Sequence, residues 1–261
     1  MAKKKILLVG MEKKAGYTAA FVDHWADFIN WGKRRKGENG FLPRMLGRHN
    51  CQRVFQSCLG DGCDSIFLLR EGFEVVSNEF SHEFIKKARA NARRYNLKLD
   101  ITTFDWRDLH RHFDQGRFDA VLCLGNSLTH LFRKSDRIKT LENFKLVLRK
   151  GGILIIDERN YQYMLDCKKE ILAGNFRYSG KYVYCGTKVQ GIPVKIGPRK
   201  VVMQYTDSRD GAKSCLELYP FKRNELLEEI RAAGFRSAER YSDYRAGFNP
   251  KADFYTYVCV R

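Results

Sequence analysis

Two patterns of apolar residues alternate along the chain from about residue 50 to residue 157. Short apolar runs, typical of buried strands, lie near residues 53–58, 73–77, 97–103, 118–124 and 153–157. Between these runs, apolar residues recur at intervals of three and four, which predicts helices over 64–70, 81–95 and 136–148. Ser81 and Ser135 are the expected N-caps of the last two helices. Strands that alternate with helices in this way favour a parallel α/β sheet.

The pattern changes on both sides of this region. Residues 160–220 are rich in glycine and tyrosine, which predicts antiparallel strands and loops that cover the sheet. A helix over 222–233, ending at Gly234, and strands near 236–241 and 254–260 complete the chain. In the first 50 residues, four apolar side chains share one face of a predicted helix: Phe21, Trp25, Phe28 and Ile29. We interpret this segment as a helical lid.

The length of 261 residues fits one α/β domain with an insertion better than two domains. We expect a lid segment over 1–50 and the α/β domain over 51–261, with the insertion at about 160–220. Hydrophobic residues make up 44% of the chain, which permits a sizeable core and excludes global disorder. No apolar stretch approaches the roughly 20 residues that cross a bilayer. The apolar run after the basic start is too short for a signal peptide, so we expect a cytoplasmic protein without a membrane partner.

Cysteines and charge narrow the expected function further. None of the eight cysteines forms a Cys-x-x-Cys pair or has a histidine at the spacing of a zinc site, so we expect reduced, mostly buried thiols and no metal. The net charge of +18 is large, but the charges are scattered and the densest run, 33–36, is short. We interpret the charge as a solvated surface that attracts anions in general, with nucleic acid as a less favoured partner.

A loop with two glycines follows the first predicted strand. Gly60 and Gly62 stand between that strand and a helix, where the polar end of a ligand can lie against backbone N–H groups. The next strand ends at Glu79, where a carboxylate is placed to bind the two hydroxyls of a ribose. Such a loop alone is common, and Glu79 could instead cap a helix. Together, the loop and the acid favour a nucleoside site.

Two later strand ends also carry polar side chains. Asp105 and Trp106 follow the 97–103 run, where the carboxylate could hydrogen-bond adenine and the indole could stack on it. A lone tryptophan at this place more often belongs to the core. The 118–124 run stops at glycine and then Asn126, with His130 shortly after, so an amide and an imidazole are offered to a ligand at the carboxyl edge of the sheet.

Arg159 follows the last strand of the alternating region, 153–157. A guanidinium at the carboxyl end of a strand can hold a substrate carboxylate through two parallel hydrogen bonds. The alternative is a surface ion pair with Asp157 or Glu158. The sequence therefore favours a small-molecule site but leaves the role of Arg159 open.

The chain resembles a known family, the glycine N-methyltransferases and the glycine/sarcosine N-methyltransferases. The resemblance covers about residues 17–261. The most specific segments are 123–131 (CLGNSLTHL) and 156–161 (IDERNY). Further similar stretches are 17–25 with Trp31, 60–65, 71–75, 105–106, 243–244 and 253–255.

The resemblance implies a seven-stranded, Rossmann-like class I methyltransferase sheet with one antiparallel strand, and S-adenosylmethionine (SAM) as cofactor. The residues implied to contact SAM are Tyr17, Trp25, Arg34 (or Arg35), Gly60, Gly62, Glu79, Asp105, Trp106, Leu124 and His130. Asn126 and Arg159 would be the catalytic pair that fixes the acceptor amino acid, with Tyr184 and Tyr219 as walls. The implied reaction is N-methylation of glycine or sarcosine, and the family resemblance also permits a homo-oligomer.

The residues agree with this chemistry. Methyl transfer from a sulfonium to an amine is a direct displacement, which needs a neutral amine in line with the methyl carbon more than it needs a strong base. Holding the two reactants in this geometry can supply several kcal/mol. Neither a catalytic triad nor a metal cluster is required for it.

Three positions depart from the family pattern. Gln56 stands where the first strand normally ends in an acid, Asp61 lies between the two glycines, and the acid after the second strand is Glu79 rather than aspartate. An extra carboxylate at Asp61 is expected to repel the SAM carboxylate unless it points outward or pairs with a cation. Two alternatives therefore accompany the main hypothesis. One is methylation of another amine or of an RNA base, and the other is a binding or regulatory homologue without catalytic activity.

Overall fold

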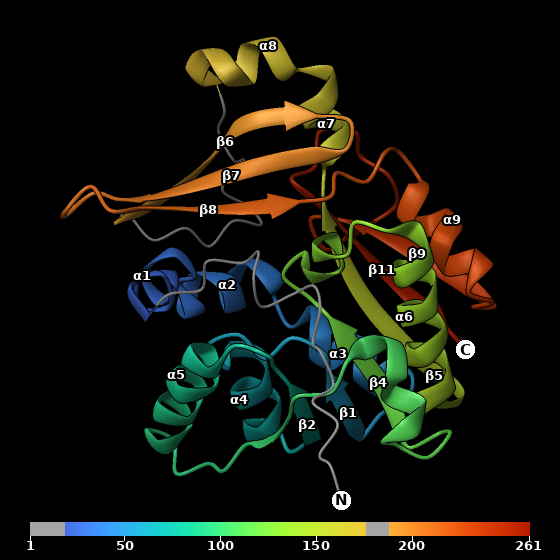
Figure 1. The fold of residues 1–261 in the computed structure, drawn as a ribbon. Helices are drawn as coiled ribbons and strands as arrows, with labels where there is room; N and C mark the ends of the chain where they lie inside the picture. The colour runs from blue at the N-terminus through green and yellow to red at the C-terminus, as the bar shows by residue number, and fades with distance from the viewer. Residues whose placement is uncertain (1–18, 176–187) are drawn as a thin grey trace, which may run out of the picture.

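The computed structural model describes residues 19–175 and 188–261. Its centre is an eight-stranded sheet in the order β10-β9-β11-β5-β4-β1-β2-β3 (Figure 1). In chain order the strands are β1 (Arg53–Gln56), β2 (Glu74–Asn78), β3 (Asp100–Thr102), β4 (Phe118–Cys123), β5 (Leu148–Arg159), β9 (Ser237–Ser242), β10 (Arg245–Ala246) and β11 (Phe254–Val260). The first five strands pair in parallel, while β11 runs antiparallel between β5 and β9. The expected α/β sheet is present, and the two-residue β10 extends its edge beyond seven strands.

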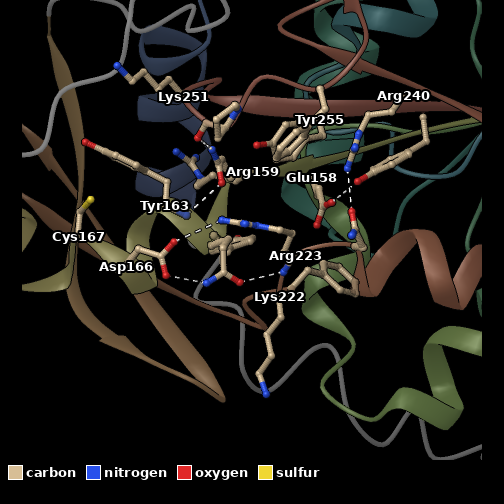
Figure 2. Close-up of a pocket in the computed structure, with 18 residues that line it drawn as sticks. Glu158, Arg159, Tyr163, Asp166, Cys167, Lys222, Arg223, Arg240, Lys251 and Tyr255 are labelled. Atoms are coloured by element: carbon tan, nitrogen blue, oxygen red, sulfur yellow. Dashed lines mark hydrogen bonds and ion pairs between the residues drawn. The ribbon is translucent and has the colours of Figure 1, made fainter.

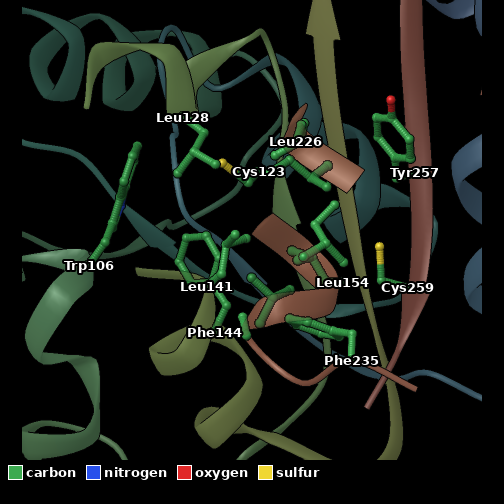
Figure 3. Packing of buried hydrophobic residues seen from close by; sticks show 14 of the residues in the cluster. Trp106, Cys123, Leu128, Leu141, Phe144, Leu154, Leu226, Phe235, Tyr257 and Cys259 are labelled. Atoms are coloured by element: carbon green, nitrogen blue, oxygen red, sulfur yellow. The ribbon is translucent and has the colours of Figure 1, made fainter. Parts of the chain in front are cut away.

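Helices cover both faces of this sheet. One face carries α3 (Phe41–Arg48), α4 (Cys63–Arg70) and α5 (His82–Arg93), and the other carries η1 (Trp106–Arg111), α6 (Lys134–Val147) and α9 (Glu225–Ala232). Alternate residues of β5 divide between the two layers. Leu154 and Ile156 pack with α6 and α9 (Figure 3), whereas Ile153 and Ile155 pack with α3. A strand buried on both faces explains why 153–157 reads as one continuous apolar run.

A second, three-stranded antiparallel sheet lies over the carboxyl edge of the large one (Figure 1). It consists of β6 (Val189–Gly197), β7 (Lys200–Asp207) and β8 (Lys213–Leu218). The short segments α7 (Tyr161–Asp166), α8 (Lys168–Glu170) and η3 (Ile171–Asn175) lead from β5 toward it. This is the antiparallel cover that the sequence predicts between residues 160 and 220.

The N-terminal helices α1 (Ala19–Phe28) and α2 (Trp31–Glu38) lie between the two sheets (Figure 1). The apolar face of α1 packs on the small sheet through an aromatic cluster in which Phe21, Trp25 and Phe28 surround Tyr205 of β7. Gly191 of β6 makes this contact possible, because a Cβ there would lie 2.9 Å from the Tyr205 ring and 3.1 Å from Phe28.

Helix boundaries differ from the sequence expectation at α6 and α9. Helix α6 begins at Lys134 with Arg133 rather than Ser135 in the N-cap position, and it ends at Val147. Leu148 already pairs with Phe118, and a register shift follows in β4, so β5 begins before Gly151. Gly151 has a φ of +71°, which lets the strand pass this irregularity instead of breaking. Helix α9 begins at Glu225 because the preceding Asn224 adopts a left-handed φ of +65°.

Within the part of the chain that the structure describes, no helix has the length and apolar character needed to cross a membrane.

Candidate functional site

The glycine loop and the acid at the end of β2 meet directly. The Glu79 carboxylate accepts hydrogen bonds from the Gly60 N–H at 2.9 Å, and from the N–H groups of Phe80 and Ser81, each at 2.9 Å. Burial raises the pKa of Glu79, while these three donors act in the opposite direction. The acid predicted to bind ribose therefore lies at the loop, at the carboxyl edge where ligands bind in open α/β sheets.

The two glycines of the loop differ in what surrounds them. A Cβ on Gly60 would meet no atom within 4 Å, so the loop has open space at this point. A Cβ on Gly62 would lie 3.1 Å from Ile66 and 3.2 Å from Ala88 of α5. Both residues have a positive φ, +55° and +92°, which favours glycine. Gly62 therefore serves the packing of α4 against α5, and Gly60 is the glycine that leaves room for a ligand.

Gln56 ends β1 just before this loop. Its side-chain N–H donates to the carbonyl of Cys58 at 3.0 Å, so it fixes the start of the loop. Its amide oxygen is buried and accepts no hydrogen bond from the residues that the structure describes. A buried acceptor of this kind is costly unless a donor reaches it.

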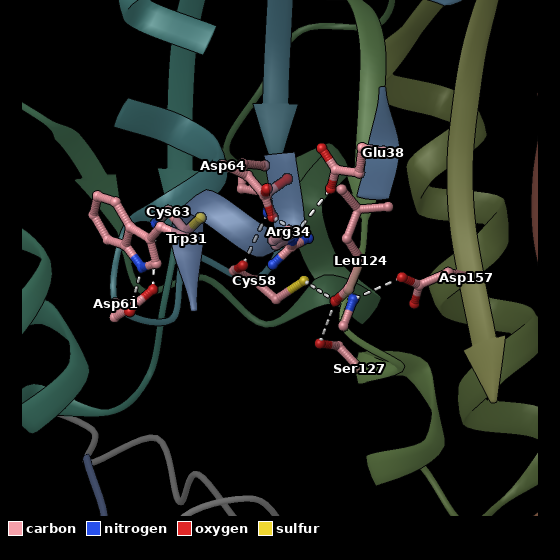
Figure 4. Close-up of polar contacts among 12 residues, drawn as sticks. Trp31, Arg34, Glu38, Cys58, Asp61, Cys63, Asp64, Leu124, Ser127 and Asp157 are labelled. Atoms are coloured by element: carbon pink, nitrogen blue, oxygen red, sulfur yellow. Dashed lines mark hydrogen bonds and ion pairs between the residues drawn. The ribbon is translucent and has the colours of Figure 1, made fainter. Parts of the chain in front are cut away.

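Helix α2 is fastened to the glycine loop and to the start of α4 (Figure 4). The indole N–H of Trp31 donates to Asp61 Oδ2 at 2.8 Å. Arg34 donates to Asp64 at 2.8 Å and to Glu38 at 3.0 Å, and Arg35 also pairs with Asp64. The arginines expected to reach SAM therefore hold α2 against α4, at the amino-terminal end of that helix.

Asp61 takes neither of the two courses expected for it. Its carboxylate faces inward, and it accepts hydrogen bonds from Trp31 and, at 3.3 Å, from the Cys63 N–H rather than pairing with a cation. Burial raises its pKa above the ordinary value for aspartate, although Trp31 and Arg34 oppose the change. The additional negative charge in the loop is thus satisfied by α2.

The turn after β4 is held by a carboxylate of β5. Asp157 accepts the Gly125 N–H at 3.0 Å and the Asn126 N–H at 2.5 Å. Asn126 has a φ of +64°, a conformation that asparagine tolerates better than most residues. Its backbone carbonyl accepts from Thr129 at 2.6 Å. Two bonds to one carboxylate therefore fix the direction of the Asn126 side chain.

The Asn126 side chain contacts Arg159, the other residue predicted to hold the acceptor. Asn126 Oδ1 accepts the backbone N–H of Arg159 at 3.1 Å, and Asn126 Nδ2 donates to the Tyr161 hydroxyl at 2.6 Å. The Arg159 guanidinium lies 4.9 Å from the centre of the Phe254 ring and is largely buried. The structure therefore brings Asn126 and Arg159 together. It adds Asp157 and Tyr161, to which the sequence reasoning gave no role although both lie in the segment 156–161.

Other predicted contacts have partners of their own in this structure. Asp105 binds Arg107, and this pairing lowers its pKa although burial acts in the opposite sense. Trp106 is 5% exposed, donates its indole N–H to the Ser57 carbonyl at 2.8 Å and contacts Phe144 in the core. This arrangement corresponds to the core role that the sequence left open for Trp106.

The remaining predicted residues lie on several elements. Leu124 is buried, and its carbonyl accepts from Ser127 and from the Cys58 thiol. His130 ends η2 (Ser127–His130), and burial lowers its pKa to about 4, so it is neutral at physiological pH. Trp25 belongs to the aromatic cluster under the small sheet. Tyr219 donates its hydroxyl to Glu225 at 2.6 Å. Tyr17 and Tyr184 lie outside the described residues.

Comparison with known proteins identifies the family. Residues 54–152 match a family model described as a methyltransferase domain. The chain is 36% identical to the glycine/sarcosine N-methyltransferase of Aphanothece halophytica, over 94% of this chain and 89% of that protein. It is 35% identical to the enzyme of the same name from Halorhodospira halochloris, over 94% and 88%.

A solved structure agrees in fold. The crystal structure of a SAM-dependent methyltransferase from Clostridium acetobutylicum ATCC 824 is similar with a TM-score of 0.70 at 17% identity, covering 91% of this chain and 96% of that one. With full-length relatives above 30% identity and the specific motifs assembled at one edge of the sheet, the chain belongs to the glycine/sarcosine N-methyltransferase family of class I SAM-dependent methyltransferases.

Proposed function

We propose that this SAM-dependent N-methyltransferase transfers a methyl group to the amino nitrogen of glycine or sarcosine. The observation that carries the proposal is the bonded group of Asn126, Arg159 and Tyr161 at the carboxyl ends of β4 and β5. The end of β1, with its glycine loop, is adjacent to β4 in the same sheet. Relatives at 35–36% identity that carry the name glycine/sarcosine N-methyltransferase support this choice of acceptor.

The described residues fit SAM at the loop between β1 and α4. Gly60 leaves open space there, Glu79 lies beside it, and the buried amide oxygen of Gln56 has capacity for a donor. Bound SAM supplies a methyl group on a positively charged sulfur. In this proposal Glu79 serves the ribose and Gln56 the amino end of the methionine portion, while the Trp31 indole N–H stabilises the Asp61 carboxylate by a hydrogen bond.

The acceptor is held by Arg159 in this proposal. Its guanidinium is mostly removed from water beside Phe254, where a two-bonded pair with a carboxylate is strong. Asn126 fixes the backbone of Arg159 and the Tyr161 hydroxyl together. Burial raises the pKa of Tyr161, so its phenol stays neutral and offers an oxygen toward the nitrogen that gains charge during the reaction.

Two further statements belong to the proposal. The seven described cysteines are all free thiols, which supports a reducing, cytoplasmic location. The hypothesis of a binding protein without activity rests on Gln56 and Asp61, and both side chains have a place in the folded loop. We therefore favour an active enzyme over a binding homologue.

The proposal is tested with Arg159→Ala, and with Arg48→Ala as control because Arg48 is an exposed arginine paired with Glu239. Removing one partner of a buried charge pair costs roughly 2–5 kcal/mol, so kcat/KM for glycine should fall by about 30-fold or more. SAM affinity measured by calorimetry should stay near that of the unmodified enzyme in both variants. Normal glycine methylation by Arg159→Ala would overturn the assignment of Arg159.

A further inference from the structure

Basic residues occur along the whole chain, and the outer face of α5 gathers several of them on one side of the molecule. This helix lies on the opposite face of the large sheet from α6 and α9 (Figure 1). The pocket of about 270 Å³ shown in Figure 2 is a different feature, because Arg159 and Tyr161 line it and it therefore belongs with the proposed acceptor site. The outer face of α5 has no part in the proposed reaction.

Helical spacing aligns three cations along α5. Lys86, Arg89 and Arg93 follow one another at intervals of three and four residues, so they lie on one side of the helix. All three are exposed, whereas apolar residues of the helix such as Phe84 and Ala88 are buried on the other side. At a rise of 1.5 Å per residue, the step from Lys86 to Arg93 covers about 10.5 Å along the helix axis.

Further cations continue the stripe past the end of the helix. Arg94 and Lys98 are exposed in the turn that follows α5. Arg70, the last residue of α4, has its guanidinium 4.8 Å from the centre of the Tyr95 ring, which holds this cation beside the same turn. We call these six exposed residues the α5 basic surface: Arg70, Lys86, Arg89, Arg93, Arg94 and Lys98.

No acid neutralises the α5 basic surface within the ranges that the structure describes. None of its six side chains forms an ion pair there, whereas the neighbouring Lys87 pairs with Asp23 at 2.8 Å. Glu83 is the only acid of α5. Like charges three or four residues apart destabilise a helix, while opposite charges at the same spacing would stabilise it. Folding therefore gains nothing from this arrangement, and an anionic partner would.

We propose that the α5 basic surface binds the phosphate backbone of a nucleic acid. Phosphates along one strand of a duplex repeat about every 3.4 Å of the axis, so the distance from Lys86 to Arg93 matches about three phosphate steps. Contacts to phosphates carry no information about the bases, so this binding is independent of sequence. The surface does not depend on which amine the enzyme methylates.

The position of α5 keeps the bound backbone away from the acceptor site. The helix begins beside Glu79, at the carboxyl edge of the sheet, and leads back toward the start of β3 at the opposite edge. A nucleic acid along this helix lies on the outside of the sheet rather than over Arg159. It is therefore a bound partner and not the methyl acceptor.

An anionic membrane fits the α5 basic surface less well. A helix that lies in a membrane interface inserts its apolar face, and the apolar face of α5 is buried inside the protein. Among the described residues from 70 to 100, Tyr95 is the only large apolar side chain that is exposed, and Arg70 lies over its ring. The surface thus offers charge without the apolar groups that a membrane would take up.

Fluorescence anisotropy with two labelled duplexes of mixed sequence, one of RNA and one of DNA, tests the proposal. We expect both to bind, and the tighter one identifies the preferred nucleic acid. Replacing Lys86, Arg89 and Arg93 together by glutamine removes three phosphate contacts, so the slope of log K against log salt should become shallower by about 2–3. Affinity at moderate salt should fall by roughly tenfold or more.

A matched control removes the same charges from the other face of the sheet. It replaces Lys134, Arg231 and Arg236 by glutamine, and these three residues are exposed on or beside α6 and α9. The control should keep the salt slope of the unmodified protein to within about 1. Glutamine favours a helix nearly as well as lysine and arginine, so both variants should fold and keep kcat/KM for glycine.

Three results would overturn the proposal. The first is an equal loss of nucleic-acid affinity in the two variants, which would show that only the total charge matters. The second is unchanged affinity in the α5 variant. The third is binding of phosphatidylserine vesicles through the α5 basic surface when neither duplex binds. Failure of glycine methylation in the unmodified protein would instead count against the proposed function alone.

Discussion

At the scale of single residues, some contacts could be predicted from the sequence and others could not. The Ser81 N-cap was predicted and is confirmed by its bond to the Phe84 N–H. The neighbourhood of Asn126 and Arg159 follows from strand ends that meet at one edge, which alternation alone predicts. The core position of Trp106 and the bond from Trp31 to Asp61 depend on side-chain packing between segments far apart in the chain. Such contacts leave no periodic signal in the sequence.

Glu158 gives a prediction at this scale, on the pH dependence of folding. Its pKa of about 8 in the folded protein exceeds the ordinary 4.5, so between these values the folded chain binds a proton that the unfolded chain does not. Stability should therefore fall as pH rises from about 5 to 8, by up to about 1.4 kcal/mol per pH unit from this group. The groups that bear on it are Tyr257, Glu225, Arg240 and Asp157.

Urea unfolding of the unmodified protein and of Glu158→Gln at several pH values measures this contribution. The variant should lack this part of the slope, and Glu239→Gln should keep it. Parallel stability curves for the unmodified protein and Glu158→Gln would show that Glu158 titrates normally in the fold.

At the scale of elements, the central strands and helices could be predicted from the sequence. The spacing of apolar residues stays constant along each of them, and each lies in one type of environment. For the elements that cover the site, the sequence predicts the type of secondary structure but not where each element docks. The apolar face of α1 was evident, but its docking on β7 through Tyr205 requires the small sheet to be in place. The start of β5 at Leu148 was missed, because Gly151 and Gly152 are typical of a break and here lie within a strand.

Gly191 allows a test of the contact between α1 and the small sheet. Gly191→Ala would place a methyl group 2.9 Å from Tyr205 and 3.1 Å from Phe28, so these rings must move. Overpacking of this kind typically costs 1–3 kcal/mol. Thermal unfolding should therefore show a clear loss of stability. Gly197→Ala in the same strand, whose new Cβ would lie 3.5 Å from the nearest atom outside its chain neighbours, should change stability much less.

At the scale of the whole molecule, the candidate site accounts for little of the net charge of +18. The described residues place charged pairs on many elements, such as Arg137 with Glu229 and Lys87 with Asp23, and the excess of basic residues remains spread over the chain. A dispersed positive charge attracts polyanions without selecting a sequence. The overall charge is thus a weak guide to the substrate, whereas the strand-end motifs are a strong one.

The dependence on salt concentration distinguishes binding through the overall positive charge from recognition through the strand-end motifs. Binding of tRNA, measured by fluorescence anisotropy, should weaken steeply between 50 and about 200 mM salt, as expected when phosphate contacts release counterions. Glycine methylation should change little over the same range, because the proposed Arg159 contact is buried. Methylation of tRNA that exceeds methylation of glycine and falls with salt would favour an RNA base as the acceptor.

The small sheet β6-β7-β8 is hydrogen-bonded within itself and rests on the rest of the protein through α1, and through the Tyr219 N–H that donates to Thr129 at 2.8 Å. During evolution, the small sheet and the rest of the protein can therefore accumulate mutations at different rates. Mutations in the cover can reshape the space above the strand ends while the hydrogen bond between the glycine loop and Glu79 stays in place. One ancestral scaffold can in this way give rise to enzymes that share a methyl donor and diverge in the amine that they accept.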